Sequence, residues 1–153
     1  MPNLDWSKLN SQQLGRYAEY YALMEFASFG FEVYTSEVDD HGVDFIVKSK
    51  QHRFIEIQVK SLRATNSGNY TFIHKTKMDV DDENRIVCFI YFINERFPDV
   101  YLIPATAWKR PNKDLVGRYY IDKTSKPEWG ICYSKRNRQL LERYKIENYI
   151  QKI

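Results

Sequence analysis

The sequence predicts a single α/β domain over residues 1–153. A proline-free stretch at 11–29 has helical character, β-prone segments follow it at 43–47, 53–60 and 86–93, and helical character returns near the end of the chain. A length of 153 residues suits one hydrophobic core, and hydrophobic residues make up 43% of the chain, which is ample for packing that core. The order of these segments therefore indicates one α/β folding unit.

The first helix is expected at about residues 11–29. Asn10 and Gln13 have the spacing of a capping box, and Gly30 suits the position just after a helix. Its apolar residues spread around much of the helix circumference, so we expect a largely buried helix. These residues are Leu14, Tyr17, Ala18, Tyr21, Ala22, Leu23, Met24 and Phe26.

The segments after this helix predict a series of strands. Residues 43–47 and 53–60 flank a polar turn at 48–52, which indicates a hairpin-like pair. Residues 86–93 form a nearly unbroken apolar run, which is typical of a strand buried on both faces. The other expected elements are short strands at 31–35, 70–74 and 100–103, a turn or short helix at 104–113, edge strands at 119–122 and 130–133, and a helix at 135–149.

Membrane and exported proteins are the classes that the sequence argues against. It contains no run of 18 apolar residues, and its first residues have neither a basic nor an apolar segment. Cys88 and Cys132 each lie inside an apolar segment, so we expect reduced core residues and not a disulfide framework. These features predict a cytoplasmic location without a membrane partner.

Positive charge is concentrated in the last third of the chain. Residues 106–153 contain 12 Lys and Arg against 5 Asp and Glu, whereas residues 1–105 contain 11 against 15. The basic residues of this third alternate with aromatic ones, as expected of a surface that contacts phosphates and stacks on bases. An ordinary solvated helix face would give the same pattern, and charge alone does not separate the two interpretations.

A group of polar residues on neighbouring strands is the strongest candidate for chemistry. In residues 54–60 polar and apolar residues alternate, so Glu56, Gln58 and Lys60 share one face of the expected strand. A solvent-facing strand would alternate in the same way, but Asp44 at the start of the preceding apolar segment is unusual unless it caps a turn or binds something. If the two strands pair, Asp44 comes close to Gln58 and Lys60. Asp44, the Gln58 side-chain oxygen and a backbone carbonyl near Val59 would then suit Mg²⁺, with Lys60 beside the metal-bound water.

These residues resemble the motif of the PD-(D/E)XK nuclease superfamily in its Gln variant, as in Mrr-like restriction enzymes and some homing endonucleases. Over residues 11–62 the match consists of Asp44, then Gln58-Val59-Lys60, with Glu19 on the preceding helix. The resemblance implies a restriction-endonuclease-like core, a central mixed β-sheet flanked by helices. It also implies that Glu19, Asp44 and Gln58 hold the metal and that Lys60 positions or activates the water. The sequence departs from the pattern in having Val43 before Asp44 in place of proline and a neutral Gln58 in place of an acid.

The function expected on these grounds is metal-dependent hydrolysis of double-stranded DNA, with Mg²⁺ or Mn²⁺ as cofactor and a homodimer or homotetramer as the working form. The alternative is a non-catalytic nucleic-acid-binding protein that retains the fold. Two further alternatives stay open at this point. Glu19 could instead pair with Arg16 or a surface lysine, and Glu56 could join the metal site. His74 and Lys75 could reach a phosphate, although a surface loop is the preferred interpretation for both.

Overall fold

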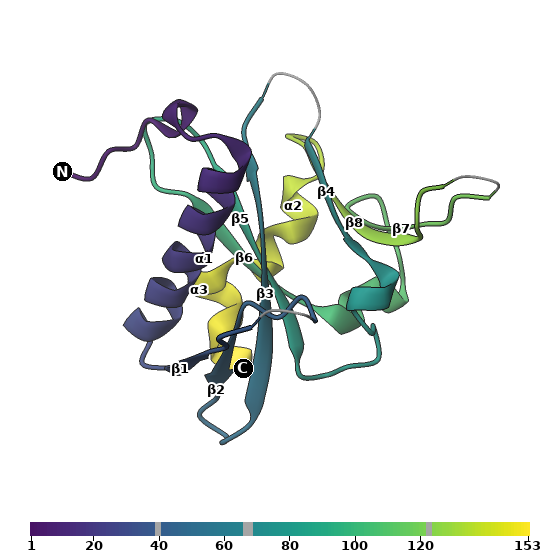
Figure 1. Cartoon of the computed structure of the whole chain (residues 1–153), viewed down its shortest axis with the longest axis horizontal. Coiled ribbons are helices and arrows are strands. Elements are labelled where there is room, and N and C mark those ends of the chain that lie inside the picture. Colours follow the sequence, from purple (N-terminus) through teal and green to yellow (C-terminus); the bar gives the residue numbers. More distant parts are fainter. Residues whose placement is uncertain (39–40, 66–68, 122–123) are drawn as a thin grey trace.

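A five-stranded mixed sheet forms the centre of the computed structural model, which describes residues 1–38, 41–65, 69–121 and 124–153 (Figure 1). Its strands have the order β1-β2-β3-β5-β6, and β3 and β5 are the parallel pair. The strands are β1 (Glu32–Thr35), β2 (Phe45–Lys48), β3 (Phe54–Arg63), β5 (Arg85–Phe92) and β6 (Asp99–Pro104). The expected α/β class with a central mixed sheet is confirmed.

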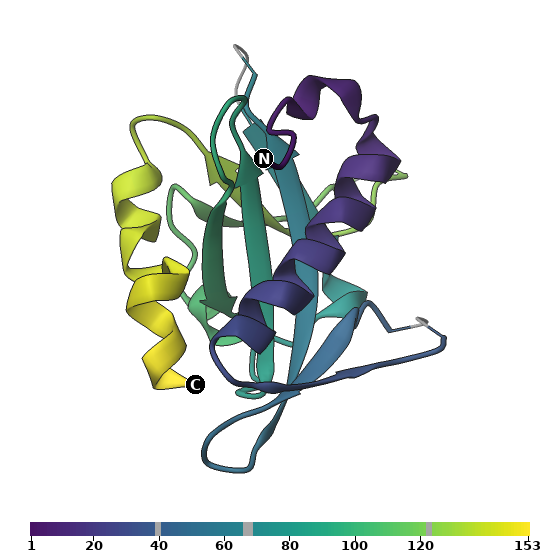
Figure 2. The same cartoon turned by 90° about the vertical axis from the view of Figure 1, so that its left-hand side faces the viewer.

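The helix α1 (Ser11–Ser28) covers one face of this sheet (Figure 2). It begins with the expected capping box, in which Asn10 and Gln13 bond reciprocally, and Gly30 after it has a φ of +86°. Its buried residues are Leu14, Ala18, Ala22 and Phe26, a single stripe at intervals of four. The expectation of a largely buried helix was wrong, because α1 packs on one side only and leaves Tyr20 and Met24 58% and 60% exposed.

A second, antiparallel sheet covers the opposite face. It has the order β4-β8-β7, with β4 at Asn69–His74, β8 at Glu128–Tyr133 and β7 at Leu115–Arg118. The strand expected at 119–122 was misplaced: Leu115 is buried and pairs with Ile131, whereas Tyr119 and Ile121 are largely exposed. Residue 122 itself lies outside the described part of the chain.

Strand β5 is buried along its whole length, as its apolar run predicted. Its residues alternate between two hydrophobic clusters. Ile86, Cys88, Ile90 and Phe92 face the cluster beneath α1, and Val87, Phe89 and Tyr91 face the cluster beneath the second sheet. Both cysteines are free, Cys88 in the core and Cys132 half-buried.

The C-terminal segment packs beside β6 as four short helical pieces. They are α2 (Arg138–Leu141), η4 (Glu142–Tyr144), α3 (Ile146–Tyr149) and η5 (Ile150–Lys152). The continuous helix expected at 135–149 is interrupted at Lys145, which has extended backbone and forms a β-bridge with Tyr101. Short 3-10 turns occur at η1 (Trp6–Lys8), η2 (Lys75–Lys77) and η3 (Ala105–Lys109). Among the described residues, no helix is long and apolar enough to span a membrane.

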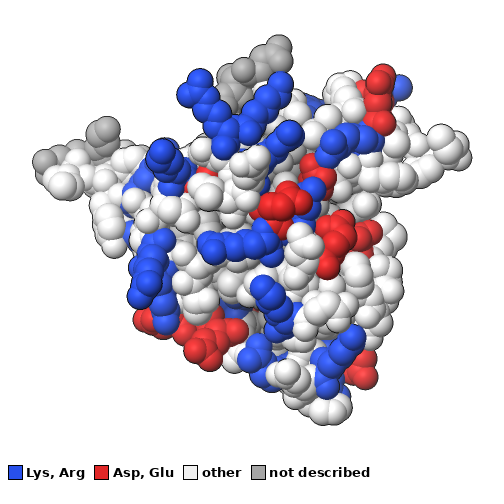
Figure 3. All heavy atoms as spheres, turned by 180° about the vertical axis from the view of Figure 1, so that it is seen from behind, with Lys and Arg blue, Asp and Glu red and all other residues white. Residues whose placement is uncertain are grey.

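The basic residues at 135–143 do not form one surface with β3. Lys135, Arg136, Arg138 and Arg143 are exposed on or just before the C-terminal helices, which lie beyond β6, two strands away from β3. Figure 3 shows the molecule from behind, with Lys and Arg spread widely over that face and acidic residues in smaller groups. These four basic residues therefore lie away from β3, whereas Arg118 of the same third stacks on Tyr70 in β4.

Candidate active site

Asp44 occupies the point where β2 stops pairing with β3. The pairing ends at Phe45 opposite Ile57, and the Asp44 backbone N–H still donates to the Ile57 carbonyl at 2.9 Å. One step further along β3, the Asp44 side chain takes over from the missing strand, since its Oδ2 accepts from the Val59 N–H at 2.6 Å. Asp44 is thus held by the main chain of β3 at two points, its backbone by Ile57 and its carboxylate by Val59.

Lys60 lies on the face of β3 that the alternation predicted, and the charge of the Asp44 carboxylate acts on its ammonium group. Ile55, Ile57 and Val59 pack in the cluster beneath α1, so the side chains of Gln58 and Lys60 emerge on the opposite face. Burial lowers the pKa of Lys60, and the negative charge of Asp44 opposes that shift. The structure therefore brings a carboxylate and a partly desolvated ammonium group within electrostatic reach of each other.

Gln58 is buried at 7% exposure and already has a cationic neighbour. Its Oε1 accepts from Arg85 Nη1 at 3.3 Å, and the same nitrogen lies 3.4 Å from the Gly42 carbonyl. Arg85 Nε also forms an ion pair with Glu56 at 3.1 Å. Glu56 is thus directed toward Arg85, and the Gln58 oxygen shares its surroundings with a guanidinium group.

Glu19 lies in a different layer from the other three residues. Its Oε2 accepts from Arg16 Nη1 at 2.7 Å on the surface of α1, and the side chain is 31% exposed. Helix α1 covers the face of the sheet opposite to Gln58 and Lys60. The structure thus shows Glu19 in the alternative pair with Arg16, and its role as a metal ligand stays a prediction.

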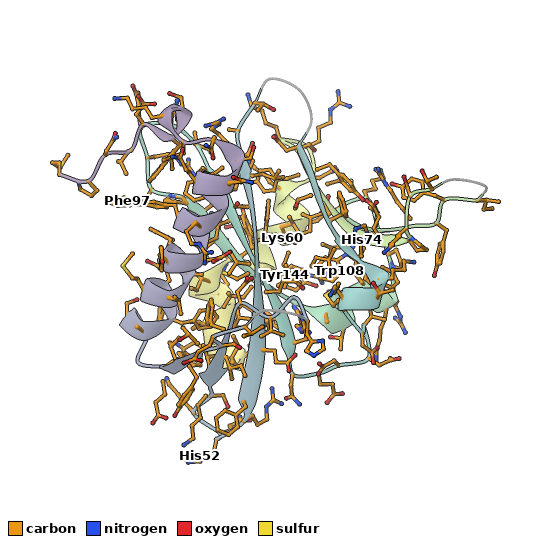
Figure 4. The ribbon with its side chains drawn as sticks, in the orientation of Figure 1. His52, Lys60, His74, Phe97, Trp108 and Tyr144 are labelled. Carbon is orange, nitrogen blue, oxygen red and sulfur yellow. The ribbon has the colours of Figure 1, made fainter. Side chains whose placement is uncertain are left out.

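An open hollow of about 340 Å³ lies in front of Lys60. Gln58 and Lys60 line it from β3, residues 70–74 line it from β4, and Lys77 completes it. Figure 4 labels Lys60 near the middle of β3 and His74 on the side of β4. His74 is therefore a strand residue at the candidate site, as the strand expected at 70–74 placed it, and not part of a surface loop.

Lys75 was also misassigned, because it does not lie in a loop. It begins η2, and its Nζ lies 3.3 Å and 3.8 Å from the ring centres of Tyr119 and Trp129. Such a sandwich is a cation–π arrangement that holds η2 against the β7 side of the second sheet. The Lys75 ammonium group is therefore engaged by protein rings.

The oxygen donors of this site suit a hard divalent cation. Magnesium is commonly held by one or two carboxylates and keeps several waters, and Asp44 with the Gln58 amide oxygen matches that requirement. Val59 contacts Asp44 through its N–H, and its carbonyl is the third donor expected from the sequence. No group of three His, Cys, Asp or Glu side chains arranged for a metal occurs among the described residues, so a cage built only of protein charges is not present there.

Arg85 is the site residue that the sequence analysis missed. It is 7% exposed and bonds to Glu56, Gln58 and Gly42 across the β3–β5 pair. A charged residue at the head of an otherwise apolar, fully buried strand was the available signal, because a buried charge needs partners. The parallel register that supplies those partners could not be read from the sequence.

Comparison with known proteins identifies the fold. No family model matches the sequence, and no curated protein matches it. Among solved structures, the bacterial homing endonuclease I-Ssp6803I is similar over 94% of both chains, with a TM-score of 0.56 and 17% sequence identity. At that identity the similarity shows a shared fold. The chain therefore has a mixed α/β fold like that of an endonuclease, over far more of its length than residues 11–62.

Proposed function

We propose that this protein is a metal-dependent DNA endonuclease of the PD-(D/E)XK type, with Gln58 at the position of the usual acid. The observation that carries the proposal is the Asp44 carboxylate, which accepts from the Val59 N–H of β3 and interacts electrostatically with the half-buried Lys60. The endonuclease-like fold supports the same conclusion. Location in the cytoplasm would agree with such an activity.

Each residue has a distinct role in the proposed reaction. Asp44, the Gln58 oxygen and the Val59 carbonyl would hold Mg²⁺ or Mn²⁺. Glu19, the further ligand predicted from the motif, would have to leave Arg16 and approach from the α1 side of the sheet. The metal would lower the pKa of a water and offset charge on the phosphate. Lys60 would hold that water and stabilise the extra negative charge that develops on the non-bridging oxygens. Arg85 would keep Gln58 and the Gly42 backbone in place.

The proposed substrate is double-stranded DNA. A site of this size cuts one strand, and two cuts on opposite strands are simplest when two symmetric copies act together. A homodimer or homotetramer is therefore the proposed working form, acting on a specific site as restriction and homing enzymes do.

Supercoiled plasmid nicking tests the proposal directly. The purified protein is incubated with plasmid and Mg²⁺ or Mn²⁺, beside Asp44→Asn and Lys60→Ala. Each substitution should reduce the nicking rate at least about 100-fold, because it removes one charge from the reacting centre. Lys50→Ala is the matched control, since Lys50 is exposed on the β2–β3 turn, and it should cut at the wild-type rate. Full activity in Asp44→Asn or Lys60→Ala, with circular dichroism confirming the fold, would refute this site.

One observation favours a second candidate, a non-catalytic nucleic-acid-binding protein that retains the fold. The guanidinium of Arg85 already lies on the Gln58 oxygen, and a neutral ligand beside a fixed cation weakens the attraction for a metal. Calorimetric titration with Mg²⁺ and Mn²⁺ separates the two functions. Metal binding by the wild type that is lost in Asp44→Asn supports the nuclease. If the wild type shows no heat of metal binding and leaves the plasmid uncut, the second candidate is supported.

A further inference from the structure

Strand β4 is the edge of the second sheet, and its hydrogen-bonding pattern shows which groups face outward. The N–H of Lys75 donates to the Pro127 carbonyl at 3.0 Å, one pair beyond the last strand pair, His74 with Glu128. Bonded and non-bonded pairs alternate in an antiparallel ladder. Residues 69, 71 and 73 therefore bond to β8, and the N–H and C=O groups of Tyr70, Phe72 and His74 point away from it.

The other side of β8 gives the same assignment. The N–H of Cys132 donates to the Asp114 carbonyl at 2.7 Å, so the even-numbered residues of β8 bond toward β7. Its odd-numbered residues, which pair with positions 69, 71 and 73, are the ones left for β4. The free edge of β4 thus presents three backbone N–H groups in alternation with carbonyls.

This free edge faces the hollow in front of Lys60. Residues 70–74 line the hollow from β4, Gln58 and Lys60 line it from β3, and Lys77 lines it from η2. None of the described residues that line the hollow is acidic. Among the described carboxylates near it, Asp44 accepts from the Val59 N–H, Glu128 from the Tyr70 hydroxyl, and Glu56 pairs with Arg85. Sheet-edge N–H groups together with the two ammonium groups of Lys60 and Lys77 favour an anion in the hollow.

We propose that the free edge of β4 binds a DNA phosphate through the Phe72 N–H and the Lys77 ammonium group. This phosphate is the neighbour, along the strand, of the phosphate at which the strand is cut. The inference rests on the proposed function and assigns the substrate-holding wall of that site. Charge complementarity favours the phosphate over a peptide strand, because the backbone of an added peptide is neutral and would not offset the charges of Lys60 and Lys77. A hollow of about 340 Å³ is within the range that accommodates small-molecule ligands.

Substitutions at Phe72 separate its backbone N–H from its side chain. Phe72→Pro removes the outward N–H and is tolerable on an edge strand, because that N–H makes no ladder bond. Phe72→Ala removes the same ring and keeps the N–H, so it is the matched control. Affinity for a short DNA duplex is measured by fluorescence anisotropy in EDTA, which prevents cutting, and the fold is checked by circular dichroism. We expect Phe72→Pro to bind about tenfold more weakly than Phe72→Ala, the value of one hydrogen bond to a charged group.

Lys77 provides an independent test that holds even if Phe72→Pro does not fold. Lys77→Ala should weaken binding and reduce the slope of log affinity against log salt by about 1, whereas Lys50→Ala should leave the slope unchanged. Equal binding by Phe72→Pro and Phe72→Ala, or equal slopes for the two lysine variants, overturns the proposal. So does loss of an oligomer on Phe72→Pro, which would assign the edge to pairing between copies. A wild type that nicks plasmid while these variants match their controls refutes only the β4 assignment, whereas a wild type that neither binds nor cuts DNA refutes the proposed function as well.

Discussion

Asp44 has a structural role that can be measured separately from any catalytic one. Its Oδ2 accepts from the Val59 N–H at 2.6 Å in a partly buried position where no strand is available to replace it. Asp44→Ala leaves that N–H without its acceptor, which should lower the free energy of unfolding by about 1–3 kcal/mol. Asp44→Asn keeps an oxygen in the same place, although a neutral acceptor is weaker than a charged one, and should cost less than about 1 kcal/mol.

Urea denaturation followed by circular dichroism measures both changes. Asp82→Ala is the matched control, because Asp82 Oδ1 accepts from the Asn84 N–H at 2.8 Å in an exposed turn, where water replaces the lost acceptor at about 0.5 kcal/mol. The free energy of unfolding of Asp44→Ala should therefore be well below those of Asp44→Asn and Asp82→Ala. If Asp44→Ala is no less stable than Asp82→Ala, or if Asp44→Asn is as unstable as Asp44→Ala, the argument that the carboxylate replaces a strand partner is incorrect.

Lys60 and two glycines provide tests that need no DNA. Burial lowers the pKa of Lys60, so an NMR titration of its side chain should have a midpoint below 10.5. The unfolded chain binds this proton more tightly, so the free energy of unfolding should rise as the pH rises toward 10.5. A midpoint at or above 10.5 contradicts the burial argument. Gly130→Ala should lower the free energy of unfolding by about 1–3 kcal/mol, because its new Cβ would overlap the Tyr70 ring. Gly15→Ala should raise the free energy of unfolding by about 0.5–1 kcal/mol, because alanine favours the helix and no atom lies within 4 Å of the new Cβ in α1. If urea denaturation gives the two glycine variants the same change in the free energy of unfolding, the packing argument is refuted.

Local signals in the sequence were sufficient for the parts of the fold that depend on neighbouring residues. The capping box at Asn10 defines where α1 begins, and the alternation in residues 54–60 defines which side chains share a face of β3. The apolar run of β5 predicted burial on both faces. These features follow from residue spacing along one element, so they need no knowledge of what packs against it.

Features that depend on pairing between distant segments were not predictable. Arg85 reaches Gln58, 27 residues earlier, only through the parallel pairing of β3 and β5. The break at Lys145 depends on a bridge to Tyr101, and β4 becomes a wall of the hollow because the second sheet folds over that face. The layer in which Glu19 lies depends on which face of the sheet α1 covers, and its role as a metal ligand stays a prediction. Tertiary packing decided each of these outcomes.

The alternation of β5 between two clusters has a consequence for how the protein unfolds. Local unfolding of the second sheet would expose Val87, Phe89 and Tyr91 to water. Local unfolding of α1 would expose the residues on the other face of β5. Neither layer can melt without exposing β5, so the two layers share their cooperativity. A destabilising substitution in α1 or in the second sheet therefore also affects β5, which pairs with β3 at the candidate site. The rigidity of the site is limited by the less stable of these two layers.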